Sequence, residues 1–179
     1  VDKFVVMYSG TISISSILAL ERVLECADRL KKEKDILFVV VGEGFKRAEL
    51  VAKAETLRLP NVLFLPFQPY EDLPYLLASS DLLLVPLDKE KSLLSVPSKL
   101  YNFMAAGKPI LGLAAACSEV AGIIEQTQCG LSVAPEDVNK LAETVRHLKE
   151  SPAERHVLAG NARAYAVQNY AKGKILDMY

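Results

Sequence analysis

The feature that most constrains the fold is an alternation of short apolar runs with segments of helical periodicity. The apolar runs are bounded by turn residues and occupy residues 4–8, 36–41, 61–65, 81–86, 110–115 and 130–133. Runs of this length without polar alternation are typical of strands buried on both faces of a parallel sheet. The alternation therefore predicts an α/β fold, a doubly wound, Rossmann-like parallel sheet of about six strands with helices on both faces. Its crossovers are expected to be right-handed.

Composition limits the broad class of protein. The chain has 179 residues, of which 51% are hydrophobic, and its formal net charge is −1. This length suits a single domain, residues 1–179, with a substantial core, and the apolar content argues against disorder. Basic residues are spread along the chain, so no nucleic-acid footprint is indicated. Because the sequence opens on Val1 rather than Met, we expect it to be part of a longer protein.

The cysteines and the longest apolar runs of the sequence indicate the cellular compartment of the protein. Cys26, Cys117 and Cys129 are odd in number and irregularly spaced, and only two histidines accompany them. Neither a disulfide framework nor a metal site is expected from this pattern, and a reducing, cytoplasmic setting fits it. No run approaches the length that spans a bilayer, and no signal peptide is predicted.

One stretch organises the site that the sequence predicts. Pro97 suits the first turn of a helix that continues to about residue 106, where Gly107 ends it and the strand 110–115 follows. The N–H groups at the start of this helix, with Lys99 beside them, form a candidate phosphate site. The alternative is an ordinary helix start that carries a solvated lysine, and the residues alone leave both open.

The loops after the first four predicted strands bring further candidates to the same edge. In a doubly wound sheet, ligands bind beyond the carboxyl ends of the strands, at the point where the strand order reverses. We therefore expect one concave pocket open on one side. A dinucleotide fingerprint is not expected, because Arg47 stands where its third glycine would be. The loop segments concerned are Gly10-Thr11, Gly42-Glu43-Gly44, Phe67-Gln68 and the run up to Lys99.

The segment 97–110 resembles the donor-site helix of family 4 glycosyltransferases (group 1), which have the GT-B fold. In that family a helix carrying a Glu is followed by Met-Ala-Ala-Gly-Lys/Val-Pro and a strand, as in Met104-Ala-Ala-Gly-Lys-Pro109 here. The rest of the chain is similar in the same order, so the resemblance covers the C-terminal, donor-binding half of such an enzyme. The Pro97-Ser98-Lys99 start is similar to a branch that contains capsule and exopolysaccharide transferases.

The resemblance implies a retaining transfer of sugar from a nucleoside-diphosphate sugar to an acceptor, without cofactor or metal. The partners that it implies are the donor and an N-terminal domain of the same chain, which carries the acceptor site and any general base. The resemblance also implies that this N-terminal half associates peripherally with the inner face of the membrane. No catalytic residue is therefore assigned within this chain, which alone should bind donor without turnover. The donor-binding residues implied are Gly10, Thr11, Gly42, Gly44, Phe67, Gln68, Ser98, Lys99 and Asn102.

Three departures from the family pattern keep an alternative open. Thr11 stands where relatives carry an Arg, and Leu94 and Asn102 replace the two glutamates of the family signature. The amide of Asn102 can still bond a ribose hydroxyl, whereas Leu94 cannot replace its carboxylate. The alternative is an inactive nucleotide-sugar-binding module. A response-regulator-like switch is disfavoured, because the first strand lacks the paired acidic residues that follow it in that class.

Several local expectations complete the sequence analysis. Phe67 either stacks on the nucleotide base or belongs to the core, and residues 87–96 are expected to form a mobile surface loop. Helices are expected over 14–34, 138–149 and 152–169. The last has an inner face of Val157, Leu158, Ala162, Tyr165 and Ala166, and an exposed apolar patch toward the missing domain is expected at Ile175, Leu176, Met178 and Tyr179.

Overall fold

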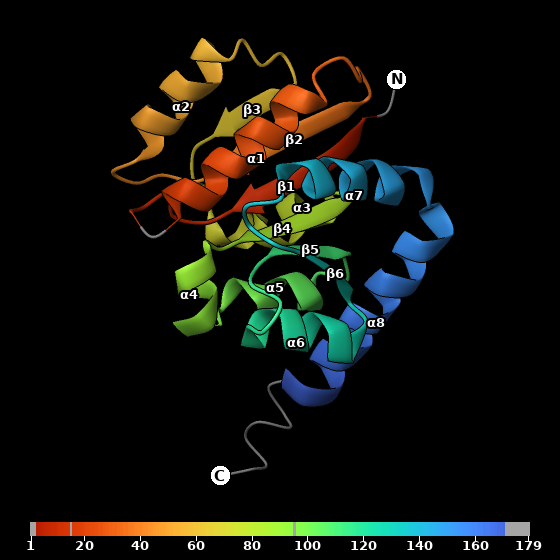
Figure 1. Cartoon of the computed structure of the whole chain (residues 1–179). Coiled ribbons are helices and arrows are strands. Elements are labelled where there is room, and N and C mark those ends of the chain that lie inside the picture. Colours follow the sequence, from red (N-terminus) through yellow and green to blue (C-terminus); the bar gives the residue numbers. More distant parts are fainter. Residues whose placement is uncertain (1–2, 15, 95, 171–179) are drawn as a thin grey trace.

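The computed structural model describes residues 3–14, 16–94 and 96–170. Its strands all belong to one parallel sheet (Figure 1). They coincide with the six apolar runs, because Val, Ile, Leu and Phe pack well on a pleated surface that is covered on both sides. The strands are β1 (Phe4–Ser9), β2 (Ile36–Val41), β3 (Val62–Leu65), β4 (Leu82–Pro86), β5 (Ile110–Leu113) and β6 (Gly130–Val133).

Helices fill the segments between the strands. The helix expected over 14–34 is shorter than predicted, because the chain leaves helical geometry after Leu30. Ser118 and Asp137 cap α6 and α7 through their side-chain oxygens, as their sequence positions predict. The helices are α1 (Ile17–Arg29), α2 (Arg47–Thr56), a 3₁₀ turn (Tyr70–Asp72), α3 (Leu73–Ala78), α4 (Lys89–Leu94), α5 (Lys99–Ala105), α6 (Glu119–Thr127), α7 (Val138–Glu150) and α8 (Pro152–Tyr170).

The strand order is β3-β2-β1-β4-β5-β6, and every neighbouring pair is parallel. This order confirms the predicted doubly wound sheet. The chain winds outward from β1 to β3, returns to the centre at β4 and winds outward again to β6. The reversal lies between β1 and β4, where such sheets bind their ligands.

Two hydrophobic cores lie on opposite faces of the sheet. One packs α1, α2 and α7 against side chains such as Tyr8, Phe38 and Leu84. The other packs α3, α5, α6 and α8 against side chains such as Met7, Val39 and Leu83. Successive strand residues therefore alternate between the two cores, as the strand period of two requires. Figure 1 shows α1, α2 and α7 above the sheet and α5, α6 and α8 below it.

The prediction of an irregular loop over residues 87–96 is wrong, because Lys89–Leu94 form α4. A tertiary contact supports this short helix. The buried Ser92 hydroxyl donates to the carbonyl of Lys89 and accepts a hydrogen bond of 3.0 Å from the N–H of Ala115, just beyond β5. Six residues of mixed charge carry too little periodicity to predict such a helix.

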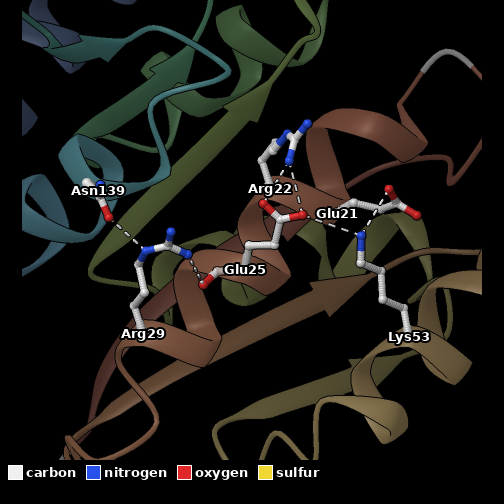
Figure 2. Close-up of polar contacts among 6 residues, drawn as sticks. All are labelled: Glu21, Arg22, Glu25, Arg29, Lys53 and Asn139. Atoms are coloured by element: carbon white, nitrogen blue, oxygen red, sulfur yellow. Dashed lines mark hydrogen bonds and ion pairs between the residues drawn. The ribbon is translucent and has the colours of Figure 1, made fainter.

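Polar contacts tie the outer surface of α1 to its neighbours (Figure 2). Glu25 accepts from Arg22 at 2.8 Å on α1, and Lys53 of α2 lies 3.1 Å from Glu21. Arg29 donates to Asn139 of α7 at 2.9 Å, which joins the two helices that cover the same face. Exposed pairs of this kind contribute about 0–1 kcal/mol each, so the apolar cores provide most of the stability.

Helix α8 begins beside α7 and crosses to the opposite side of the domain, where it packs against α5 (Figure 1). Leu158, Ala162 and Ala166 are buried there, which confirms the predicted inner face, whereas Val157 is exposed and Tyr165 is half-buried. The apolar residues expected near the C-terminus, Ile175, Leu176, Met178 and Tyr179, lie outside the described residues. Within the described ranges, no helix is long and apolar enough to cross a membrane.

Candidate functional site

The pairing of β1 with β4 stops short of the carboxyl end of the sheet, and this end of the two strands is called the β1–β4 switch point below. The two strands pair only through Val6 with Leu82 and Met7 with Leu83, whereas β1 pairs with β2 from Phe4 to Ser9. The last residues of β1, Tyr8 and Ser9, therefore have a paired strand on the β2 side and none on the β4 side. The sheet separates at the reversal of its strand order, where the topology predicts a ligand.

Lys99 reaches the end of β1 at this switch point. It begins α5, which packs on one face of the sheet, while the ring of Tyr8 belongs to the core on the other face. The Lys99 ammonium nevertheless lies 4.0 Å from the centre of the Tyr8 ring. The lysine side chain thus crosses the carboxyl edge of the sheet at the end of β1. The interpretation of Lys99 as a solvated surface lysine is wrong, because the side chain is half-buried.

Gly10 makes room for this ammonium. A Cβ atom added to Gly10 would lie 2.3 Å from Nζ of Lys99 and 3.1 Å from the Tyr8 hydroxyl oxygen. Only a residue without a side chain leaves that space, and the positive φ of +154° at Gly10 is itself a glycine conformation. Gly10 therefore fixes how closely the Lys99 ammonium approaches the backbone at the end of β1.

The charge of Lys99 is poorly compensated. Burial lowers the pKa of Lys99 to about 8. Among the residues that the structure describes, no carboxylate lies within ion-pair distance of its ammonium, which contacts the Tyr8 ring instead. A desolvated cation without a counter-charge at the switch point of the sheet indicates an anion-binding site, because an anionic ligand would offset the cost of its burial.

The loop after β1 is fixed by hydrogen bonds. The Tyr8 hydroxyl donates to the carbonyl of Thr11 at 2.8 Å. The hydroxyl of Ser16 accepts from the N–H of Ser13 at 2.9 Å, so it supports the loop instead of capping α1. The backbone of Thr11 is thereby held just beyond the end of β1. Burial raises the pKa of the Tyr8 hydroxyl to about 12.

An added side chain at Gly42 or Gly44 would meet backbone atoms, whereas at Gly10 it would meet the side chain of Lys99. An added Cβ at Gly42 would lie 2.0 Å from the carbonyl oxygen of Gly10, and one at Gly44 would lie 2.2 Å from that of Ile12. The loops after β1 and β2 continue the strand pairing through Gly10 N–H to Val41 and Ile12 N–H to Glu43. The packing of one backbone on another therefore requires both glycines, independently of any ligand.

The structure brings Gly10, Thr11, Gly42 and Lys99 together at the end of β1. Phe67 and Gln68 follow β3, two strands away from β1, and Phe67 is 51% exposed. The interpretation of Phe67 as a core residue is therefore wrong. Ser98 is exposed at the start of α5 and makes no side-chain capping bond. With seven residues, α5 is too short to add a substantial helix dipole.

Asn102 lies on α5 three residues after Lys99 and is exposed. It lines a cavity of about 310 Å³ between α3, α5 and α8, together with Tyr70, Leu73 and Pro74. Leu94, which occupies the position of the first signature glutamate, is 76% exposed at the end of α4. Asn102 thus combines a free amide with an adjoining hollow, whereas Leu94 offers only an apolar surface.

Two further observations complete the site. The described residues include no group of three His, Cys, Asp or Glu side chains that could hold a metal ion. Sequence reasoning missed Tyr8, because a tyrosine inside an apolar strand is indistinguishable from an ordinary core residue. Its spacing of two residues before Gly10 is the only signal in the sequence that could have drawn attention to it.

Comparison with known proteins finds relatives of this chain. The sequence model of the family described as "Glycosyl transferases group 1" matches residues 2–165. The chain is 34% identical over 180 residues to WcaI of Escherichia coli (strain K12), a glycosyl transferase assigned to colanic acid biosynthesis. That alignment covers 99% of this chain and 42% of WcaI.

Solved structures share the fold. WaaG, a glycosyltransferase involved in lipopolysaccharide biosynthesis, superimposes with a TM-score of 0.76 at 27% identity, covering 94% of this chain and 44% of WaaG. Anabaena HepE in complex with UDP-glucose also gives 0.76, at 22% identity, covering 98% of this chain and 47% of HepE. The likeness to HepE concerns the fold alone. In each comparison the chain spans less than half the length of the protein that it matches.

Proposed function

The chain belongs to the family of group 1 glycosyl transferases, and on that premise we propose that residues 1–179 form the donor-binding domain of a sugar transferase. The domain binds a nucleoside-diphosphate sugar, and the complete protein transfers that sugar to an acceptor in polysaccharide or glycoconjugate biosynthesis. The names of WcaI and WaaG support such a pathway. The acceptor site would lie on a further, N-terminal domain, because the chain spans less than half the length of WcaI and of WaaG.

One observation supports this proposal most strongly, namely the uncompensated ammonium of Lys99 at the β1–β4 switch point. The diphosphate of a donor brings the negative charge that this position lacks. During transfer, the bond between the sugar and the diphosphate breaks and negative charge develops on the leaving oxygen. A cation that is already in place stabilises that charge without reorganisation of the site.

The remaining residues suit the other parts of the donor. Asn102 follows Lys99 by three residues on α5, which corresponds to about 5 Å along the helix axis at the usual rise per residue. Its amide can therefore bond a ribose hydroxyl beside the diphosphate. With the usual strand spacing, the end of β3 lies about 10 Å from the end of β1, and this distance suits a contact of Phe67 and Gln68 with the base. The exposed ring of Phe67 can stack on the base.

Calorimetric titration of the 179-residue chain tests the proposal. The probes are UDP-glucose, GDP-mannose and ADP-glucose, with glucose and the three free nucleosides as controls. We expect saturable binding of at least one nucleotide sugar and none of glucose. Binding of no nucleotide sugar at millimolar concentration would refute the assignment, and the preferred base would identify the donor class.

The replaced glutamates favour a second candidate, a module that binds the donor but does not transfer it. Leu94 supplies no carboxylate, and Asn102 supplies an amide in place of one. Release of UDP from UDP-glucose by the natural protein, with acceptor present, separates the two candidates. A transferase releases UDP in proportion to the acceptor, whereas a binding module shows saturable binding and releases none.

We also propose that transfer retains the anomeric configuration and that donor binding needs no divalent cation. Lys99 supports the second point, because it places a positive charge where a metal would otherwise be needed. Equal affinity in EDTA and in magnesium would agree with it, and a loss of binding in EDTA would contradict it. The three free cysteines support a reducing, cytoplasmic setting.

A further inference from the structure

We propose that Tyr8 is a positioning residue for Lys99, whose ammonium it holds over the end of β1 in the orientation that meets the donor diphosphate. This inference rests on the proposed function of donor binding. It concerns a residue that contacts Lys99 and is buried beneath it, with 1% of its surface exposed.

The Tyr8 ring is rigidly held. Its body belongs to the core formed with α1, α2 and α7, and its hydroxyl donates to the carbonyl of Thr11 at 2.8 Å. A ring fixed at both ends offers its face in one position only. The Lys99 ammonium lies 4.0 Å from the centre of that face, which is within the range of a cation–π interaction.

An aromatic partner suits this position better than a carboxylate. A carboxylate would neutralise Lys99 and would have to be displaced or repelled when an anionic donor arrives. The ring attracts the ammonium through its quadrupole and does not neutralise it, so the positive charge can still attract an anionic partner. The charge is thus stabilised in the empty site and still attracts the ligand.

Gly10 restricts the ammonium from the other direction. Nζ of Lys99 occupies the space in which a Cβ of residue 10 would lie, so it fits between the backbone of Gly10 and the Tyr8 ring. The flexible lysine side chain is thereby confined before the ligand binds. Such preorganisation lowers the entropic cost of forming the ligand contact.

The test is a double-mutant cycle on the 179-residue chain, with UDP-glucose or whichever nucleotide sugar binds best as the probe. Tyr8→Leu removes the ring, Tyr8→Phe keeps the ring and removes the hydroxyl, and Lys99→Met removes the charge. We expect Tyr8→Leu to weaken binding about 2- to 30-fold, the range of a cation–π contact. Tyr8→Phe should stay within about threefold of the parent, since the ring remains.

Two readouts distinguish positioning from a structural role. In the Lys99→Met background, Tyr8→Leu should have no further effect on affinity, because the group that it positions is gone. The pH at which affinity begins to fall should move to a lower value in Tyr8→Leu and stay in place in Tyr8→Phe. Equal losses from Tyr8→Leu with and without Lys99 would overturn the inference.

A measurement on the parent protein covers the case in which Tyr8→Leu fails to fold. The Cε protons of Lys99 should resonate upfield of those of exposed lysines, because the ring current of Tyr8 acts on them. An unshifted resonance would overturn the inference. The proposed function fails separately, if the parent binds no nucleotide sugar or if Lys99→Met binds it as tightly as the parent does.

Discussion

Alanine at Gly42 should damage the fold, whereas alanine at Gly10 should mainly damage ligand binding. The added Cβ of Gly42→Ala would meet the carbonyl oxygen of Gly10 at 2.0 Å and its carbon at 3.1 Å. Both are backbone atoms, and they are held by the hydrogen bonds of Gly10 N–H to Val41 and of Gly42 N–H to Leu65. Neither strand end can move without breaking this pairing.

The magnitude follows from two costs. An L-residue at the φ of +158° found at Gly42 costs about 1–3 kcal/mol, and forcing extra volume into a packed contact costs about 1–3 kcal/mol more. The sum of about 2–6 kcal/mol is a large share of the stability of a typical domain. For a chain of this size it corresponds to a decrease in Tm of roughly 4–24 °C.

Gly10→Ala differs because its closest obstruction is the end of a flexible side chain, the Lys99 ammonium at 2.3 Å. The lysine can swing away, so we expect a loss of stability limited to the backbone strain, about 1–3 kcal/mol. The displaced ammonium no longer meets the diphosphate, and affinity should fall about as far as in Lys99→Met.

Thermal and urea unfolding of both variants, with titration of the folded protein, provides the assay. Gly160→Ala is the matched control, because nothing lies within 4 Å of its added Cβ on α8. It should keep or slightly raise stability, by up to about 1 kcal/mol, since alanine is the better helix former. A Gly42→Ala variant as stable as the parent would refute the reasoning from backbone contact.

Three further predictions concern the site and its support. The affinity for a nucleotide sugar should be nearly constant below about pH 7 and fall about tenfold between pH 7 and pH 9, because burial lowers the pKa of Lys99 to about 8 and only the protonated form attracts the phosphates; calorimetry of the parent and of Lys99→Met, which should show no such fall, checks this. Asn102→Ala should weaken binding less than Lys99→Met, about 0.5–1.5 kcal/mol, because a neutral hydrogen bond is lost; an equal or larger effect would assign the main contact to Asn102. Ser92→Ala should lower the free energy of unfolding by about 1–3 kcal/mol, since it leaves the buried N–H of Ala115 without its acceptor. Urea unfolding measures this loss, with Ser79→Ala, which removes an exposed hydroxyl, as the control.

The sequence predicts the sheet well, because a strand buried on both faces must be apolar along its whole length. The runs 36–41 and 81–86 correspond to β2 and β4 within one residue. The order of the strands follows from the topology of doubly wound sheets rather than from any single residue. Helix α4 could not be predicted, because it depends on the contact of Ser92 with Ala115, which is distant in the sequence.

The candidate site could be predicted only in part. The loops that carry Gly10, Gly42 and Lys99 were identified because each follows a strand, and the structure brings these residues together. The role of Tyr8 could not be predicted, because its partner arrives from a helix on the other face of the sheet. Whether a glycine faces a ligand or another backbone is likewise a tertiary property, as the contrast between Gly10 and Gly42 shows.

The most direct test of the central claim is the affinity of Lys99→Met for the preferred nucleotide sugar at two salt concentrations. Lys31→Met is the matched control, since Lys31 is exposed and lies between α1 and β2, at the opposite edge of the sheet. We expect Lys99→Met to weaken binding by about 1–3 kcal/mol, less so at high salt, and Lys31→Met to leave it unchanged. Equal affinity of Lys99→Met and the parent at both salt concentrations would contradict the assignment of the β1–β4 switch point as the diphosphate site.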